Sequence, residues 1–402
     1  MTVTNAREVY YDPYDVDIEA DPYPVYRRLR EEAPLYYNET HDFYAVSRYE
    51  DVEKGLVDHK TFISGRGGIL ELIKAGIEMP PGILIFEDPP THTVHRRLLS
   101  RVFTPRKMNA LEGQIRQYCA EALDPIVGSE RFDFVADLGR QMPMRVIGML
   151  LGIPVDDQAK VRDKVDSDLR TEPGKPQKYT EAGLANGEIF ADYIDWRSEH
   201  PSDDLMSELL MAEFEDETGT VRRLSRNEIL TYTNVVAGAG NETTARLIGW
   251  AGKVLAEHPD QRRALVEDPA LIPNAVEELL RFEPPAHHIA RYVTADVELH
   301  GRTVPAGSVM MFLTGSANRD DRRFPDGDRF DVGREVGSHL AFGYGIHFCL
   351  GAALARLEGR VALEEVLKRF HEWDVDYDNI KMATTTTVRG WETLPTIIRQ
   401  AA

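Results

Sequence analysis

Cysteine is scarce in this chain of 402 residues, and its scarcity excludes several classes of protein. The two cysteines, Cys119 and Cys349, form one disulfide at most, which excludes a scaffold held together by disulfides. A zinc site built only from cysteines, or an iron–sulfur cluster, needs about four thiolates and is excluded as well. So few thiols predict a protein of a reducing compartment, and we expect the cytoplasm.

Long hydrophobic runs are also absent from the sequence. A membrane helix needs about 20 consecutive apolar residues, and no stretch approaches that length. The longest candidate, residues 147–155, is interrupted by Gly152 and Pro154. The first 26 residues are polar and acidic, without a basic segment followed by an apolar one. We therefore expect neither a signal peptide nor a membrane anchor.

Positive charge is in short supply, because 47 Lys and Arg face 67 Asp and Glu, for a net charge of −20. Binding to nucleic acid in general depends on Lys and Arg, and so does attraction to anionic membranes. The balance therefore argues against both kinds of partner. At 42% hydrophobic and 28% charged residues, the composition is that of a globular protein rather than a disordered one.

Apolar periodicity predicts a mainly α protein with a small β portion at both ends. Apolar residues recur with helical spacing in three stretches, 108–127, 227–257 and 350–370. Cys119 lies on the apolar face of the first stretch. Strand-like alternation occurs at 43–49 and at 296–313, where a Pro-Ala-Gly turn interrupts it. Polar breaks rich in Pro, Gly or charge predict loops between helices: 171–178, 198–204 and 215–226.

The segment 342–360, FGYGIHFCLGAALARLEGR, is the most informative in the sequence. Cys349 stands among Gly343, Gly345 and Gly351 just before a predicted helix, and glycines let the backbone adopt positive φ near a bulky ligand. A thiolate at a helix N-terminus is stabilised by free N–H groups and the helix dipole. Apolar neighbours would keep water away, which suits a metal with one anionic axial ligand. The alternative is a small buried cysteine in a glycine-rich turn.

A second unusual segment is VVAGAGNETTARL, residues 235–247, inside the predicted helix 227–257. Gly238 and Gly240 each cost about 1 kcal/mol at a helix interior. They indicate either close packing against another helix or a local widening of the helix at a ligand. Glu242 and Thr243 follow in an apolar setting, where a carboxylate is expensive unless it has a role. Together they could relay protons.

These segments resemble the conserved motifs of the cytochrome P450 family. The pattern F-G-x-G-x-H-x-C-x-G resembles the family's cysteine loop, and Ala-Gly-Asn-Glu-Thr-Thr, residues 239–244, resembles its oxygen-activation motif. An E-x-x-R pair, Glu278 and Arg281, lies upstream of the cysteine as in the family. The resemblance extends from about Asp21 to the C-terminus. It implies one cytochrome P450 domain over residues 1–402, mainly α with small β-sheets.

The resemblance also implies a cofactor, haem b (heme b, iron protoporphyrin IX), and roles for named residues. Cys349 would be the metal ligand, while Glu242 and Thr243 would be the catalytic acid and alcohol. His92, Arg96, Arg291 and His347 would bind the haem propionates. The other residues expected to bind the cofactor are Phe342, Gly343 and Gly351. A structural network is expected from Glu278, Arg281 and Arg329.

The substrate pocket is expected to be apolar, because residues 69–86 contain eleven apolar residues and three charges. In the family this region covers the pocket; a packed core helix is the alternative. His287 and His288 would either hydrogen-bond a polar group of the substrate or serve as structural histidines. The full set of expected pocket residues is Ile83, Val236, Ala239, Gly240, His287, His288, Ile289, Val388 and Trp391.

The reaction implied is monooxygenation of an apolar small molecule, a terpenoid or branched lipid, by O2. Electrons would come from NAD(P)H through a ferredoxin reductase and a ferredoxin. The exposed-looking Arg97 and Arg101 indicate either a docking patch for that acidic donor or a solvated helix face. Three alternatives remain: a peroxide-driven P450, a non-catalytic haem sensor, and an all-α interaction protein. The Glu242–Thr243 pair argues against the first two, and the cysteine loop against the third.

Overall fold

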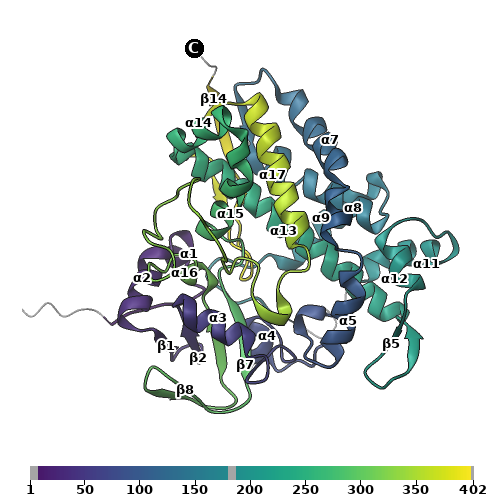
Figure 1. The fold of residues 1–402 in the computed structure, drawn as a ribbon, viewed down its shortest axis with the longest axis vertical. Coiled ribbons are helices and arrows are strands. Elements are labelled where there is room, and N and C mark those ends of the chain that lie inside the picture. Colours follow the sequence, from purple (N-terminus) through teal and green to yellow (C-terminus); the bar gives the residue numbers. More distant parts are fainter. Residues whose placement is uncertain (1–7, 180–186, 400–402) are drawn as a thin grey trace, which may run out of the picture.

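The computed structural model describes residues 8–179 and 187–399, and these form a mainly helical fold with small sheets (Figure 1). The N-terminal helices and the main sheet lie together on one side, and the long helices α7, α8, α13 and α17 pack on the other (Figure 1). The helices are α1 Val16–Ala20, α2 Tyr23–Glu32, α3 Tyr49–Val57, α4 Leu70–Ala75, α5 Thr91–Ser100, α6 Pro105–Asn109, α7 Glu112–Leu123, α8 Met142–Leu151, α9 Val155–Leu169, α11 Ala191–Glu199, α12 Leu205–Met211, α13 Arg226–Glu257, α14 Pro259–Glu267, α15 Ile272–Phe282, α16 Thr314–Ala317 and α17 Ala352–Arg369. Shorter helical segments are η1 Leu84–Phe86, η2 Asp124–Ile126, η3 Phe134–Gly139, η4 Glu188–Phe190, η5 Pro269–Leu271 and η6 Gly345–His347.

The largest sheet has five strands in the order β1-β2-β10-β7-β3, where β2 and β10 are parallel and the other pairs antiparallel. Its strands are β1 Leu35–Asn38, β2 Phe43–Val46, β3 Phe62–Ile63, β7 Ile289–Val293 and β10 Val309–Phe312. A second sheet joins β4 Arg131–Asp133, β11 Glu372–Val375 and β14 Pro395–Arg399. Three two-stranded pairs are β5 Glu213–Glu215 with β6 Val221–Arg223, β8 Val297–Leu299 with β9 Arg302–Val304, and β12 Lys381–Met382 with β13 Trp391–Thr393.

Helix α13 is the central element, in contact with α8, α9, α14, α15, α17 and η3. Its first turn is closed by a capping box: the N–H of Glu228 donates to Oγ of Ser225 at 3.3 Å, and the N–H of Ser225 donates to the Glu228 carboxylate at 2.7 Å. The side chains of α13 are buried on several faces because other elements surround it. This cap and this packing hold the segment 235–247 in the middle of the protein.

The predicted elements are largely present. The expected helix over 227–257 is α13, the expected helix over 350–370 is α17, and 108–127 contains α6, α7 and η2, with Cys119 fully buried in α7. The prediction of a loop over 215–226 is wrong in part, because this stretch completes the β5–β6 hairpin. Its turn is closed by Asp216, whose Oδ1 accepts from the N–H groups of Thr218 at 2.9 Å and Thr220 at 3.0 Å.

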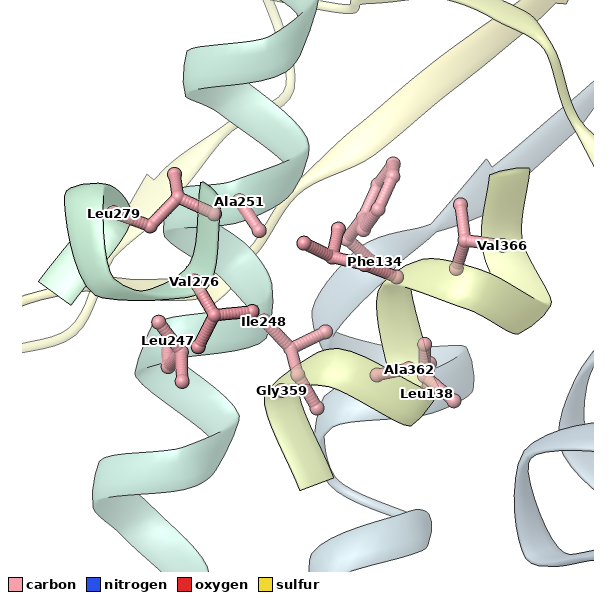
Figure 2. Close-up of a pocket in the computed structure, with 11 residues that line it drawn as sticks. Phe134, Leu138, Leu247, Ile248, Ala251, Val276, Leu279, Gly359, Ala362 and Val366 are labelled. Atoms are coloured by element: carbon pink, nitrogen blue, oxygen red, sulfur yellow. The ribbon is translucent and has the colours of Figure 1, made fainter. Parts of the chain in front are cut away.

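An apolar cavity of about 10 Å³ lies between η3, α13, α15 and α17. Figure 2 shows Phe134, Ile248 and Val276 converging on it from three different elements. A space of this size holds about one water molecule, so it is a packing void of the core and not a substrate pocket. Within the described residues, no helix combines the length and the apolar character needed to cross a membrane.

Candidate active site

Cys349 lies at the end of a tight loop that leads directly into α17. Its N–H donates to the carbonyl oxygen of Phe342 at 2.9 Å, which closes the loop three residues before the helix begins. Gly343 and Gly345 have φ of +67° and +68°, and a Cβ at Gly345 would lie 2.9 Å from the carbonyl oxygen of Leu56. Both positions therefore require glycine. The expected need for positive φ does not extend to Gly351, where φ is −84°.

The surroundings of the Cys349 sulfur have opposing effects on the pKa of its thiol. Burial raises the pKa of the thiol, whereas the N–H of Gly351 and the guanidinium groups of Arg96 and Arg356 oppose that rise because they stabilise the thiolate. A bound metal ion deprotonates a coordinating thiol outright. The Cys349 loop therefore fits a metal that binds one thiolate.

Four basic side chains from separate elements gather beside this loop. His92 and Arg96 come from α5, Arg291 from β7 and His347 from η6. The rings of His92 and His347 are 4.3 Å apart between centroids, and Nε2 of His347 lies 3.0 Å from Oγ of Ser64. Burial, followed by Arg291, His92 and Arg96, lowers the pKa of His347 to about 2. The four predicted propionate-binding residues are thus brought together.

The side chains of this basic cluster lack some of the ion-pair and hydrogen-bond partners that buried polar groups need. Across residues 8–179 and 187–399, neither Arg96 nor Arg291 forms an ion pair, and Nε2 of His92 is buried without a hydrogen-bond partner. Burial lowers the pKa of Arg291 to about 10. A buried cation calls for an anionic partner. Haem carries two carboxylates and an iron that accepts an axial thiolate, so the residues present fit this cofactor.

The turn of α13 that carries the alcohol is accessible, although the helix around it is buried. Ala239 is exposed, and Oγ1 of Thr243 donates to the Ala239 carbonyl oxygen at 2.7 Å. The expected widening of the helix is wrong, because α13 is continuous α-helix from Arg226 to Glu257. Close packing explains Gly240 instead: a Cβ there would lie 2.3 Å from Cδ1 of Ile147 on α8.

Glu242 is buried one residue before Thr243 and forms an ion pair with Arg246 one turn later. Arg246 also donates to the carbonyl oxygen of Trp391 in β13. The acid and the alcohol of the predicted relay are therefore both held in place by hydrogen bonds. Their side chains project from adjacent positions of one helix.

Glu358 is a buried acid that sequence reasoning missed. It lies on α17 with a relative exposure of 1%, and one carboxylate oxygen accepts from Oγ1 of Thr244 at 3.1 Å while the other has no partner. Burial raises the pKa of Glu358 to about 8, so this carboxyl group is mainly protonated at neutral pH. A signal existed in the sequence, since Glu358 shares the apolar helix face of Leu354 and Val361.

The E-x-x-R pair is a buried ion pair: the Arg281 Nε lies 2.6 Å from the Glu278 carboxylate, and both side chains are fully buried. The prediction that Arg329 completes this network is wrong for its side chain, which is exposed and pairs with Asp331 at 2.6 Å. Arg334 takes that place instead, with its Nε 3.2 Å from Glu278. Arg329 contributes only its carbonyl oxygen, which accepts from Arg281 at 3.2 Å.

Several predicted pocket residues lie near the elements just described. Ile83 is buried in an apolar cluster with Leu72 and Phe86, all within the segment 69–86. Cδ1 of Ile289 would lie 3.8 Å from a Cβ at Gly343 in the cysteine loop. Burial lowers the pKa of His288 to about 4, partly offset by a hydrogen bond with the backbone of Thr386. Val236 is partly buried against the core, and Val388 is buried.

Trp391 and His287 are both buried. Trp391 packs edge-on against Trp250 with ring centroids 5.2 Å apart, and 6% of its surface is exposed. His287 lies against the rings of Tyr23 and Tyr26 at centroid distances of 5.8 and 6.0 Å. It also lines a cavity of about 40 Å³ with His288 and Val388, and among the described residues its Nε2 has no hydrogen-bond partner, so both alternatives for His287 stay predictions.

The predicted docking residues lie on the exposed side of α5 and just after it. Arg97 and Arg101 are exposed, and in the part of the chain that the structure describes neither pairs with an acid. They are free to meet charge from outside the molecule.

Comparison with known proteins identifies the family. The family model "Cytochrome P450" matches residues 184–395. The chain is 41% identical to the putative cytochrome P450 123 of Mycobacterium tuberculosis, over 96% of both chains, and 35% identical to the vitamin D(3) 25-hydroxylase of Pseudonocardia autotrophica, over 98% of both. The structure of cytochrome P450 CYP109E1 from Bacillus megaterium with testosterone aligns with a TM-score of 0.84 at 30% identity, over 96% of this chain and 100% of that one. The chain therefore belongs to the cytochrome P450 family of haem-dependent monooxygenases.

Proposed function

We propose that this protein is a haem-thiolate monooxygenase that hydroxylates a lipid- or terpenoid-like molecule, with Cys349 as the axial ligand of haem b. The observation that carries the proposal is the joint placement of this thiol and four basic side chains, of which Arg96 and Arg291 form no ion pair within residues 8–179 and 187–399. Haem b, when bound, uses O2 and two electrons to place one oxygen atom in a substrate C–H bond, while the other becomes water.

The chain's own residues bind and orient this cofactor. His92, Arg96, Arg291 and His347 supply nitrogen donors to the two propionates, and the charge of the arginines is neutralised there. Cys349 supplies the thiolate, while the glycines of its loop let the backbone pass close to a flat ring.

Proton supply is assigned to the acid–alcohol pair. Thr243 presents its hydroxyl at the accessible turn of α13, and Glu242 exchanges protons behind it while Arg246 fixes its orientation. Glu358 holds a second proton close by, on the carboxyl group that Thr244 hydrogen-bonds. This arrangement supports O2 rather than peroxide as the oxidant.

The substrate class rests on the apolar lining and on the relatives. The Ile83 cluster with Leu72 and Phe86 offers apolar side chains and no charge. One relative is named for vitamin D(3) hydroxylation, and a neighbouring structure holds testosterone, both apolar terpenoid-derived molecules. A ligand of this kind should convert the haem to its high-spin form.

Electrons are proposed to come from NAD(P)H through a ferredoxin reductase and a ferredoxin that docks on Arg97 and Arg101. Both side chains are exposed basic groups in a chain of net charge −20, where they suit an acidic partner. Arg101→Glu should slow haem reduction by the ferredoxin and leave the substrate-induced spectral shift intact. Unchanged reduction kinetics would exclude this patch as the docking site.

The central test is the absorption spectrum of the dithionite-reduced protein under CO. Wild type and Cys119→Ala should both give the red-shifted Soret band of a thiolate-ligated haem, whereas Cys349→Ser should lose it. Cys119→Ala is the matched control because it removes the other thiol, which is buried in α7. A wild-type spectrum typical of imidazole ligation, or a band that persists in Cys349→Ser, would overturn the proposal.

A further inference from the structure

Behind Glu242 lies a second buried carboxyl group, Asp166 of α9. Its exposure is 8%, and it reaches α13 from a helix 75 residues away in sequence. Nδ2 of Asn241 donates to Oδ1 of Asp166 at 3.1 Å, and the neighbouring Glu242 carboxylate interacts electrostatically with Asp166. Two carboxylates held close together repel each other, so one of them binds a proton more tightly than a free carboxylate does.

Every charged group that faces Asp166 can be named. Glu242 and Arg246 come from α13, and Arg140 from the turn between η3 and α8, with its Nη2 3.2 Å from Asp166. Burial first, and then the Glu242 carboxylate, raise the pKa of Asp166, while Arg140 and Arg246 lower it. The balance places the proton on Asp166 under conditions in which an exposed aspartate is ionised.

Asp166 also has a connection to the surface. Its side chain is 10% exposed, and its partner Arg140 is 29% exposed and binds Asp163, which is 60% exposed, at 3.1 Å. The Asp166 carboxyl group can therefore exchange protons with solvent along this edge of α9. The guanidinium groups orient the acids and carry no protons, because they stay charged.

We propose that Asp166 is the outer proton-holding residue of the relay that ends at Glu242 and Thr243. In one cycle the Asp166 carboxylic acid gives its proton to the Glu242 carboxylate, and the resulting Asp166 carboxylate takes one from solvent. No bond to carbon changes and no electron moves. Asp166 acts through Glu242, so it is a positioning and relay residue. The inference rests on the proposed function, and it adds an entry point for protons between α9 and α13.

The first test is infrared difference spectroscopy of the haem-loaded protein between pH 5 and pH 8, in H2O and D2O. Glu358 and Glu19 also hold protons in this range, so every protein compared here carries Glu358→Gln and Glu19→Gln. The protein with Asp166 intact should show a carboxylic C=O band that is lost as the pH rises and that shifts in D2O. Asp166→Asn should lack this titrating band, and Asp166→Glu should restore it. Asp163→Asn is the matched control, because it removes a carboxylate from the same helix and the same arginine, and it should keep the band.

The second test is the rate of O2 consumption driven by NADPH through a surrogate ferredoxin and its reductase. Asp166→Asn should slow it by about tenfold, less than the ~100-fold that a direct proton donor contributes, and should change its pH profile and solvent isotope effect. A titrating band that survives in Asp166→Asn, or that Asp163→Asn removes equally, would overturn the inference. If the CO band is normal while this band is missing in the protein with Asp166 intact, only the Asp166 inference fails.

Discussion

Replacing Glu358 with glutamine should make the stability of the protein less dependent on pH. The native carboxyl group has a pKa of about 8, raised by burial from the ordinary value of 4.5. The native state therefore binds this proton more tightly than the unfolded chain does. The stability from this group is fully present below pH 4.5 and is lost as the pH rises towards 8.

The size of the effect follows from the two pKa values. Between pH 5 and pH 7 the unfolded carboxyl group ionises while native Glu358 stays mainly protonated. At 1.36 kcal/mol per pKa unit, the free energy of unfolding should fall by roughly 2–3 kcal/mol over this interval. A glutamine oxygen can still accept from Thr244, and an unpaired buried amide costs roughly 1–3 kcal/mol at every pH. The pH dependence, rather than the absolute stability, is therefore the informative quantity.

The assay is urea unfolding of the haem-loaded wild type and Glu358→Gln at pH 5, 6 and 7, followed by circular dichroism. The difference in unfolding free energy should move in favour of the variant by roughly 2–3 kcal/mol from pH 5 to pH 7. Glu217→Gln, at an exposed position in the β5–β6 turn, should show a constant difference. A constant difference for Glu358→Gln as well would refute the assignment of a protonated buried acid.

Two further predictions concern stability and loop geometry. Arg281→Ala removes the main ion-pair partner of the fully buried Glu278 carboxylate and should lower the free energy of unfolding by about 3–5 kcal/mol. Arg329→Ala, at an exposed ion pair, should change it by less than about 1 kcal/mol. Similar losses for the two variants in urea unfolding would contradict the corrected network. Gly345→Ala places a Cβ at φ +68° and 2.9 Å from a backbone oxygen, so it should lower haem content measured by CO binding. Gly113→Ala on α7, which meets no atom within 4 Å, is the control and should not.

The features that sequence predicted well are local ones. The helix that became α13 is set by its own capping box and apolar positions, and the cysteine loop is set by Gly343, Gly345 and the helix that follows. The four basic residues beside the loop come from distant segments. Periodicity alone could not have joined them, so their grouping depended on the resemblance to the family.

The features that sequence missed depend on tertiary contacts between distant positions. Arg329 and Arg334 are both arginines in one loop, and only the folded path of that loop decides which one meets Glu278, 56 residues away from Arg334. Glu358 is neutralised by its burial against α13, and Thr244 lies 114 residues before it. Asp166 is one of five aspartates in α9, and only packing against α13 distinguishes it.

The basic cluster at His92, Arg96, Arg291 and His347 has a consequence for how the protein is made. Arg96 and Arg291 are cations with little access to water and no ion pair in the described residues, which raises the free energy of the folded chain, and a ligand that binds only the folded state stabilises it by mass action. Maturation of the polypeptide is therefore coupled to cofactor supply. A cell that translates this chain faster than it synthesises porphyrin will accumulate a less stable apoprotein, which is the form open to proteases.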